Sequence, residues 1–199
     1  MNFHKLISVI LHPIVIPTIG VILFLSISPL EVRKERQYLL ISIVFFATYI
    51  IPLISLIILK ALGYINSFQV TTIKERKTPI YLMLLIFYVL GKLLYNIVAF
   101  KELGILFFGT ITALVIVYFL FFLKIKTSLH VLSLSSMLGF FLLYATLHSI
   151  SILPIAIVLV LLTGILASAR LHLKAHTPKE IYIGFFLGFT SQFITFLFL

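Results

Sequence analysis

Long apolar segments alternate with short polar intervals along the whole chain. Seven stretches consist almost entirely of apolar residues, at positions 6–28, 38–58, 80–98, 103–123, 131–147, 152–168 and 181–199. Each is close to the roughly 20 residues that an α-helix needs to cross a bilayer. The pattern predicts an all-α protein, a polytopic transmembrane helical bundle with about seven spans, six being possible.

The first apolar segment, 6–28, differs from the others because His12, Pro13 and Pro17 interrupt it. A short basic start before an apolar stretch is also typical of a signal peptide, but here the prolines break the apolar region and no small-residue cleavage pattern follows. We therefore expect a retained span. His12 would either bond to carbonyls that the prolines leave free or support a functional site.

Composition makes the membrane assignment firm. The chain has 62% hydrophobic residues, 10% charged residues and a mean hydropathy of +1.28, whereas soluble domains carry about 25% charged residues. With 199 residues and this many spans, we expect one membrane domain over 1–199. The chain contains no cysteine, which excludes disulfides, thiolate catalysis and Cys-ligated metal centres. A net charge of +10 suits an anionic partner, and in so apolar a chain that partner is a lipid phosphate rather than a nucleic acid.

Seven crossings would place the N-terminus and the intervals 61–79, 124–130 and 170–180 on one face of the membrane. Ten of the 15 Lys and Arg residues belong to this face: Lys5, Lys60, Lys74, Arg76, Lys77, Lys124, Lys126, Arg170, Lys174 and Lys179. The positive-inside rule would put the face in the cytoplasm. A phosphate site also gathers basic residues, so the orientation stays open.

The polar island at 167–180 carries the most suggestive chemistry, with Arg170, His176 and Glu180 in the spacing R-x5-H-x3-E. A guanidinium can hold a phosphate through two hydrogen bonds. An imidazole can attack phosphorus or move a proton, and a carboxylate can fix its tautomer. These are the parts of a phosphoryl-transfer site.

Simpler interpretations of the same residues exist. Arg170, His176 and Glu180 could only cap and pair at a turn at the membrane edge, and His130 could be an interfacial side chain. His172, His176 and Glu180 also follow an i, i+4, i+8 spacing that could hold a metal on one helical face. Pro178 argues against a helix running through that stretch, and we expect neither a metal nor another cofactor.

Three polar intervals together resemble the three signature motifs of the type 2 phosphatidic acid phosphatase (PAP2) superfamily of integral membrane enzymes. The third motif, Ser-Arg-x5-His-x3-Asp, corresponds to Ala169 through Glu180. In the second, Ser128, Leu129 and His130 stand where Ser-Gly-His is expected. In the first, Lys74, Arg76 and Pro79 supply the residue types at a shorter spacing. The chain is similar over nearly its full length to a hydrophobic PAP2-like group of Bacteroidetes-type bacteria, which implies a PAP2-like core in the bacterial inner membrane.

The resemblance implies a role for each motif residue. His176 would be the nucleophile that forms a phosphohistidine, Glu180 would orient it, and His130 would protonate the leaving oxygen. Arg170, Lys74 and Arg76 would bind the phosphoryl oxygens, and Ser128 could donate to one of them. No metal takes part in this mechanism.

The expected function is therefore removal of phosphate from a membrane lipid through a phosphohistidine. Candidate substrates are phosphatidic acid, phosphatidylglycerophosphate, a polyprenyl pyrophosphate or a lipid A phosphate. The alternative is a catalytically inactive PAP2-like protein that binds lipid, transports or assembles a complex. A His176 replacement would separate the two, since it should abolish phosphate release only in an enzyme.

Overall fold

The computed structural model describes residues 3–29, 31–68, 70 and 72–199, and every regular element in this part of the chain is helical. In chain order the elements are α1 (Phe3–Ile10), α2 (Ile16–Ile27), α3 (Lys34–Phe45), the π-helical turn η1 (Phe46–Ile50), α4 (Ile51–Ala61), α5 (Ile73–Tyr95), the 3₁₀ turn η2 (Val98–Phe100), α6 (Lys101–Leu120), α7 (Leu129–His148), α8 (Leu153–His172) and α9 (Pro178–Phe198).

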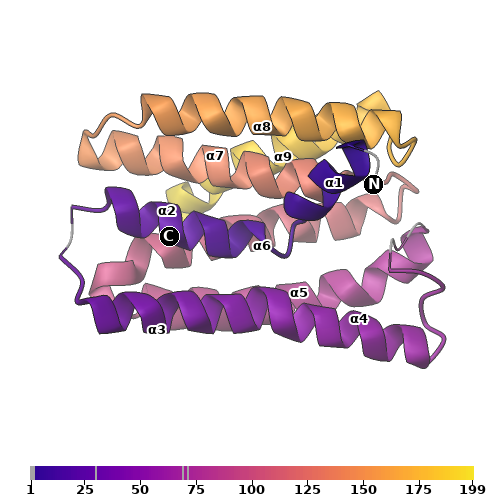
Figure 1. Cartoon of the computed structure of the whole chain (residues 1–199), viewed down its shortest axis with the longest axis horizontal. Helices are drawn as coiled ribbons and strands as arrows, with labels where there is room; N and C mark the ends of the chain where they lie inside the picture. Colours follow the sequence, from indigo (N-terminus) through magenta and orange to yellow (C-terminus); the bar gives the residue numbers. More distant parts are fainter. Residues whose placement is uncertain (1–2, 30, 69, 71) are drawn as a thin grey trace.

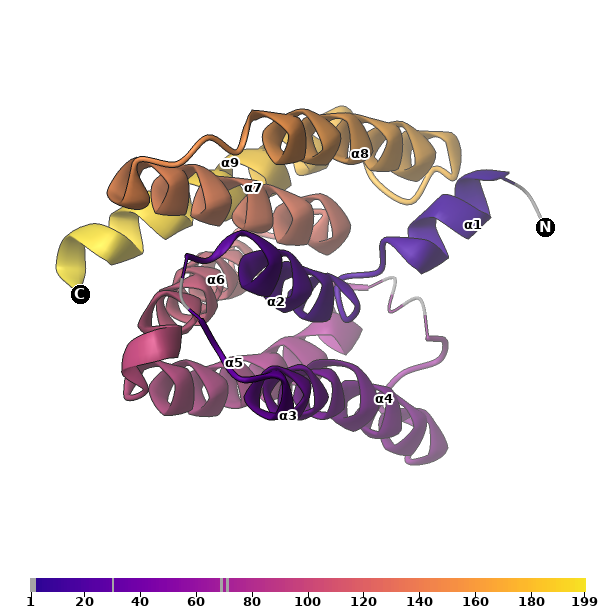
Figure 2. The same ribbon diagram turned by 60° about the vertical axis from the view of Figure 1, so that its left-hand side comes forward.

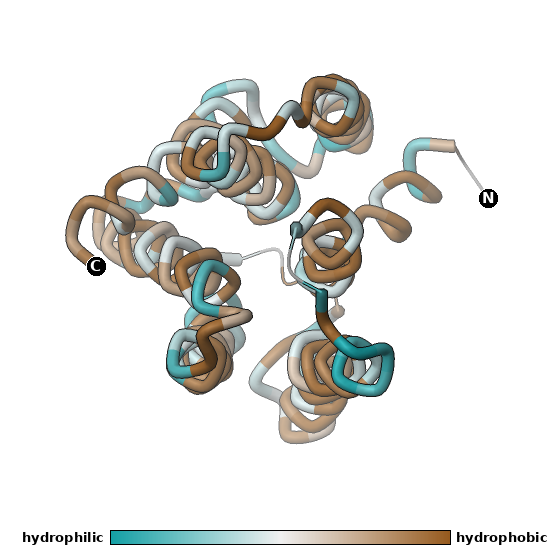
Figure 3. Tube along the Cα trace, turned by 90° about the vertical axis from the view of Figure 1, so that its left-hand side faces the viewer, coloured by the Kyte–Doolittle hydropathy of each residue, from teal (hydrophilic) through white to brown (hydrophobic). Residues whose placement is uncertain are grey.

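The long helices form a bundle whose axes run in roughly the same direction (Figure 1). Within the described residues, six helices are long and apolar enough to cross a membrane: Lys34–Ala61, Ile73–Tyr95, Val98–Leu120, Leu129–His148, Leu153–His172 and Pro178–Phe198. An end-on view shows apolar residues along most of each helix (Figure 3). The prediction of an all-α polytopic bundle is confirmed, and this is the architecture of an integral membrane protein.

The first apolar segment is broken, unlike the continuous span that the sequence predicted at 6–28. α1 ends at Ile10 and α2 begins at Ile16, because Pro13 has no N–H to continue the helical hydrogen bonds and Pro17 fits best in a first helical turn. α2 has 12 residues, about 18 Å at the helical rise, which is too short to cross the roughly 30 Å hydrocarbon core alone. α2 runs along the bundle, and α1 is tilted away from it and lies beside α8 (Figures 1 and 2).

α5 begins earlier than the hydropathy pattern predicted, at Ile73 rather than at position 80. Thr72 and Glu75 form a capping box: the Thr72 hydroxyl accepts the Glu75 N–H at 3.3 Å, and Glu75 accepts the Thr72 N–H at 3.2 Å. Reciprocal bonds of this kind satisfy N–H groups that the first helical turn leaves free. Lys74, Arg76 and Pro79 therefore lie on a helix and not in a loop.

α7 and α9 approach each other closely through glycines. Gly184 and Gly188 form a G-x-x-x-G pair on α9, and a Cβ at Gly184 would lie 2.7 Å from the Ser128 carbonyl oxygen. A Cβ at Gly188 would collide with the Leu132 carbonyl and the Ser135 hydroxyl. Small residues let membrane helices pack backbone to backbone. This packing fixes the start of α9 beside the start of α7.

The polar segments between the helices gather at one end of the bundle. The start of α1 and the connections from α4 to α5, from α6 to α7 and from α8 to α9 lie at the right-hand end of Figure 1, and the connections from α2 to α3, from α5 to α6 and from α7 to α8 lie at the opposite end. The basic intervals that the predicted crossings would place on one face thus share one end of the molecule. We call it the basic end.

Candidate active site

Hydrogen bonds tie the connections of the basic end together. Arg76 on α5 donates from Nη1 to the Thr127 carbonyl oxygen at 3.1 Å. The Ser128 N–H donates to the Glu180 carbonyl oxygen at 3.1 Å, which joins the start of α7 to the first turn of α9. The three intervals that resemble phosphatase motifs are therefore in direct contact in the folded chain.

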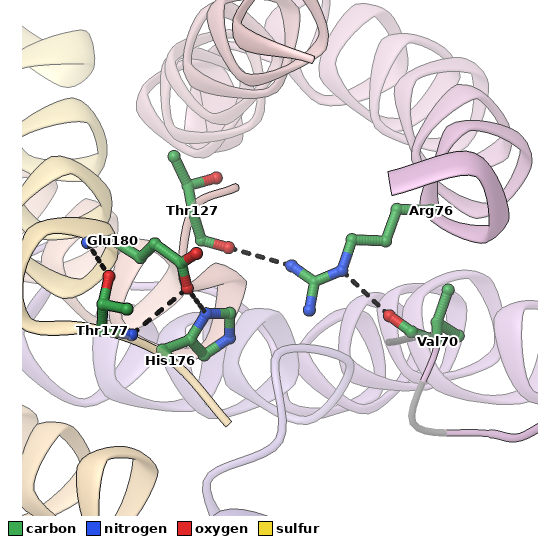
Figure 4. A network of polar contacts seen from close by, with 6 residues as sticks. All are labelled: Val70, Arg76, Thr127, His176, Thr177 and Glu180. Atoms are coloured by element: carbon green, nitrogen blue, oxygen red, sulfur yellow. Dashed lines mark hydrogen bonds and ion pairs between the residues drawn. The ribbon is translucent and has the colours of Figure 1, made fainter. Parts of the chain in front are cut away.

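His176 and Glu180 form the closest polar pair of this region. Thr177 is the N-cap of α9, and its hydroxyl accepts the Glu180 N–H at 3.3 Å. Glu180 Oε2 accepts the Thr177 N–H at 3.3 Å and lies 2.7 Å from Nδ1 of His176 (Figure 4). One carboxylate oxygen thus closes a capping box and holds the imidazole. Glu180 is therefore both part of a helix cap and a carboxylate that orients His176.

The pair fixes which ring nitrogen of His176 is available. A carboxylate accepts hydrogen bonds, so Nδ1 carries the proton and the lone pair of the neutral ring is on Nε2. Figure 4 shows Nε2 on the ring edge away from Glu180, on the side where Arg76 lies. His176 is buried, with 7% of its surface exposed, and it lines the cavity described below.

The surroundings of His176 favour its neutral form. The pKa of His176 is lowered from 6.5 to about 4, mainly by burial and also by the charges of Arg76 and Arg170, while the hydrogen bond and the charge of Glu180 act in the opposite direction. Desolvation and like charges both disfavour a protonated imidazole. At neutral pH, Nε2 therefore has a free lone pair, as a nucleophile or a base requires.

Arg76 is held in place by backbone carbonyls. Besides the bond to Thr127, its Nε donates to the Val70 carbonyl oxygen at 2.9 Å (Figure 4). The side chain is buried and lines the cavity. Arg76 therefore links two connections of the basic end and brings a fixed positive charge to the site.

Arg170 comes from the last turn of α8 and has spare hydrogen-bonding capacity. Its Nη1 donates to the Ser8 hydroxyl on α1 at 3.3 Å. Its Nε is buried and has no partner among the residues that the structure describes. A buried donor without a partner is costly, so the site favours an anionic ligand that would accept from Arg170.

His130 and His12 complete the histidines of the site. His130 Nε2 lies 3.2 Å from the Ser8 carbonyl oxygen, and since a carbonyl only accepts, Nε2 carries the proton. The His12 ring lies edge-on to His130, with ring centres 5.0 Å apart. His12 Nδ1 accepts the Ile14 N–H at 3.4 Å, so it does not donate there to a freed carbonyl, and both rings line the cavity.

A cavity of about 190 Å³ begins at these side chains and continues between the helices. Its polar lining at the basic end comprises His12, Arg76, His130, Arg170 and His176. Apart from a few hydroxyls, the other lining side chains are apolar, and most of them come from α2, α4, α5, α6 and α7. A cationic end that opens into an apolar interior can accept a molecule with an anionic head and a hydrocarbon tail.

Lys74 and Ser128, two of the predicted site residues, do not line the cavity. Lys74 is exposed near the start of α5 and does not line the cavity, because Arg76, two positions further along the helix, takes the inward direction. Ser128 is fully buried, and its hydroxyl finds no partner within the described part of the chain. It is not a lining residue; its backbone N–H, bonded to Glu180, is what contributes to the site.

The helical metal triad considered from the spacing of His172, His176 and Glu180 does not form. α8 ends at His172 and α9 begins at Pro178, so the three residues do not share a helix face. Lys174, with a φ of 51°, turns the chain between them. The His172 ring instead stacks on His4 of α1, with centres 3.9 Å apart.

Sequence reasoning missed Ser8, which contacts both Arg170 and His130 through different atoms. A serine in an apolar stretch 162 positions away from its arginine partner gives no signal in the sequence. The two T-x-x-E boxes, Thr72 to Glu75 and Thr177 to Glu180, were readable. They would have marked the true starts of α5 and α9.

Comparison with protein-family models, curated proteins and solved structures gives no match for this chain. The resemblance to the PAP2 superfamily therefore rests on the sequence motifs, and the functional argument rests on the geometry of the site.

Proposed function

We propose that this protein is an integral membrane phosphatase that removes a phosphate from a lipid through a phosphohistidine intermediate. The observation that carries the proposal is the pairing of His176 Nδ1 with Glu180 at 2.7 Å inside a cavity that also contains Arg76 and Arg170. An oriented, neutral imidazole beside two guanidiniums is suited to attack a phosphate ester.

In the first step, the Nε2 lone pair of His176 would attack phosphorus. The bond between phosphorus and the lipid oxygen breaks, and that oxygen takes a proton from the protonated, cationic form of His130 and leaves as an alcohol. Arg170 and Arg76 would stabilise the charge on the phosphoryl oxygens. Glu180 would stabilise the positive ring that forms, as a carboxylate does in catalytic triads.

In the second step, His130 would take a proton from water as the water oxygen attacks the phosphohistidine. The bond between phosphorus and Nε2 breaks, its electron pair returns to the ring, and inorganic phosphate leaves. The sum of the steps is hydrolysis of one phosphate ester by one water. For a diphosphate substrate, the leaving group would be the lipid monophosphate.

The test is phosphate release by the purified, detergent-solubilised chain in the presence of EDTA. The panel would contain phosphatidic acid, phosphatidylglycerophosphate, a polyprenyl pyrophosphate and lipid A. Release by the wild type and its loss in His176→Gln is the expected result. The matched control is His172→Gln, which changes an exposed histidine of the same island that lies outside the cavity and should retain activity.

A second candidate function is lipid binding without catalysis. It is favoured by the two hydrogen bonds that Arg76 donates to the Val70 and Thr127 carbonyls, since a purely structural cross-link would make the same bonds. In that case no lipid of the panel would release phosphate, yet lipid phosphates would still bind and raise the melting temperature.

A further inference from the structure

The apolar part of the cavity has a definite depth. Its lining on α7 extends from Leu129 to Met137, and on α5 from Arg76 to Phe87. At the helical rise these spans are about 12 Å and about 16 Å long. Measured from the basic end, the cavity therefore reaches about the middle of a hydrocarbon core roughly 30 Å thick.

Gly20 forms part of the deep end. It lines the cavity on α2, and a Cβ there would lie 3.4 Å from Met137 Sδ and 3.8 Å from Leu106 Cδ2. Met137 and Leu106 line the same cavity from α7 and α6. The glycine leaves open a space that any larger side chain would occupy, and its backbone is ordinary helix, so glycine is not required there for conformation.

An aromatic cluster lies beyond this end of the cavity. Phe24, one turn after Gly20, packs against Phe140 and Tyr144 of α7, with ring centres 6.3 Å and 5.2 Å away. The three rings are buried and do not line the cavity. Phe24 and Phe140 follow Gly20 and Met137 by about one turn on α2 and α7, so the cluster lies behind the residues that end the cavity, and we call it the floor.

We propose that Gly20 and Met137, with the Phe24 ring below them, set the length of the hydrocarbon tail that the cavity accepts from a lipid phosphate. The inference rests on the proposed function for the position of the headgroup at Arg76 and Arg170. Charge complementarity selects this occupant, since the cationic end and the apolar walls belong to one continuous cavity. Tail methylenes gain from burial only as far as the floor.

The test uses the full chain in lipid nanodiscs and a series of monoalkyl phosphates of increasing chain length. The readout is the rise in melting temperature, with the alkanol of equal length subtracted to remove simple partitioning into the bilayer. For the wild type, stabilisation should grow with tail length and then level off. We call the tail length at which it levels off the break.

Two substitutions should move this break in opposite directions. Gly20→Leu fills the deep end, so the break should occur at a shorter tail. Phe24→Ala opens the floor, so the break should occur at a longer tail; Phe24→Leu is the milder variant if Phe24→Ala does not fold. Gly164→Leu on α8 is the matched control, since a Cβ there has no neighbour within 4 Å and Gly164 is not a lining residue.

Identical chain-length profiles for Gly20→Leu and Gly164→Leu would overturn the inference. Because the readout is binding, it is separate from catalysis. A shifted break without phosphate release would keep the tail site and refute the phosphatase. Phosphate release with an unshifted break would keep the phosphatase and refute the tail site.

Discussion

Glu180 Oε2 and His176 Nδ1 lie 2.7 Å apart, and the same oxygen accepts the N–H of the N-cap residue Thr177. The same carboxylate oxygen therefore both caps α9 and orients the imidazole. Whatever fixes the start of α9 also fixes the direction of His176 Nε2. The chain offers a second capping box, at Thr72 and Glu75, in which no histidine takes part.

Glu180→Gln should lower kcat by about 10²-fold or more while the protein still folds. The amide keeps the shape of the carboxylate but loses the charge that holds the Nδ1 proton and stabilises the charged ring. Glu75→Gln is the control, because it alters a capping box of the same type away from His176. Equal loss of activity in both variants would mean that Glu180 acts only as a helix cap.

The stability of the wild type should fall as the pH is lowered from about 6.5 to about 4. His176 has a pKa of about 4 in the folded chain and an ordinary pKa near 6.5 when unfolded. Below pH 6.5 the unfolded chain takes up a proton that the folded chain resists, which favours unfolding. Melting temperatures of the wild type and His176→Gln between pH 7.5 and 4 would measure this. A difference between the two that is constant with pH would contradict the prediction.

Ser8→Ala should weaken substrate binding and leave kcat nearly unchanged. The substitution removes the hydroxyl that Arg170 contacts at 3.3 Å and keeps the carbonyl that His130 contacts. A hydrogen bond of this type contributes about 0.5–1.5 kcal/mol or somewhat more with a charged donor, so KM should rise about threefold to tenfold. Ser26→Ala, which alters an exposed serine of α2, is the control. A fall in kcat with constant KM would refute this positioning role.

Lysine substitutions should distinguish the two arginines. Arg76→Lys should lower the melting temperature, because one ammonium cannot replace the two bonds to Val70 and Thr127. Arg170→Lys should leave the melting temperature nearly unchanged and reduce kcat/KM about tenfold to 100-fold, the value of one or two bonds to a charged phosphate. Thermal unfolding and kinetics of both variants test this. A larger stability loss in Arg170→Lys would reverse the assignment.

Gly188→Ala should destabilise the protein and also reduce activity. The added methyl would collide with the Leu132 carbonyl and the Ser135 hydroxyl, which forces α7 and α9 apart and disturbs the contact between Ser128 and Glu180. Gly164→Ala adds the same methyl where nothing lies within 4 Å. Thermal unfolding should show a loss for Gly188→Ala alone. Similar behaviour of the two variants would show that this close approach is not needed.

The sequence by itself determined the class of protein and most of its helical segments. Apolar stretches of bilayer length leave a chain few choices, because every backbone N–H and C=O in hydrocarbon must be paired within a helix. Two predicted crossings separate Arg76 from His130 and two separate His130 from His176, which implied that the three would share one end of the bundle. That part of the site followed from counting segments and from the R-x5-H-x3-E spacing.

Only the tertiary structure decided which side chains meet at that end. Lys74 and Arg76 are equivalent by charge, but the phase of α5 directs one outward and the other into the cavity. Ser8 reaches Arg170 because α1 breaks from α2 near Pro13 and packs beside α8. Contacts between residues far apart in the chain depend on helix rotation and on close approaches such as that of Gly188 of α9 to Leu132 of α7. Helix rotation and close approach are set by the packing of many side chains at once, and local sequence patterns do not predict them.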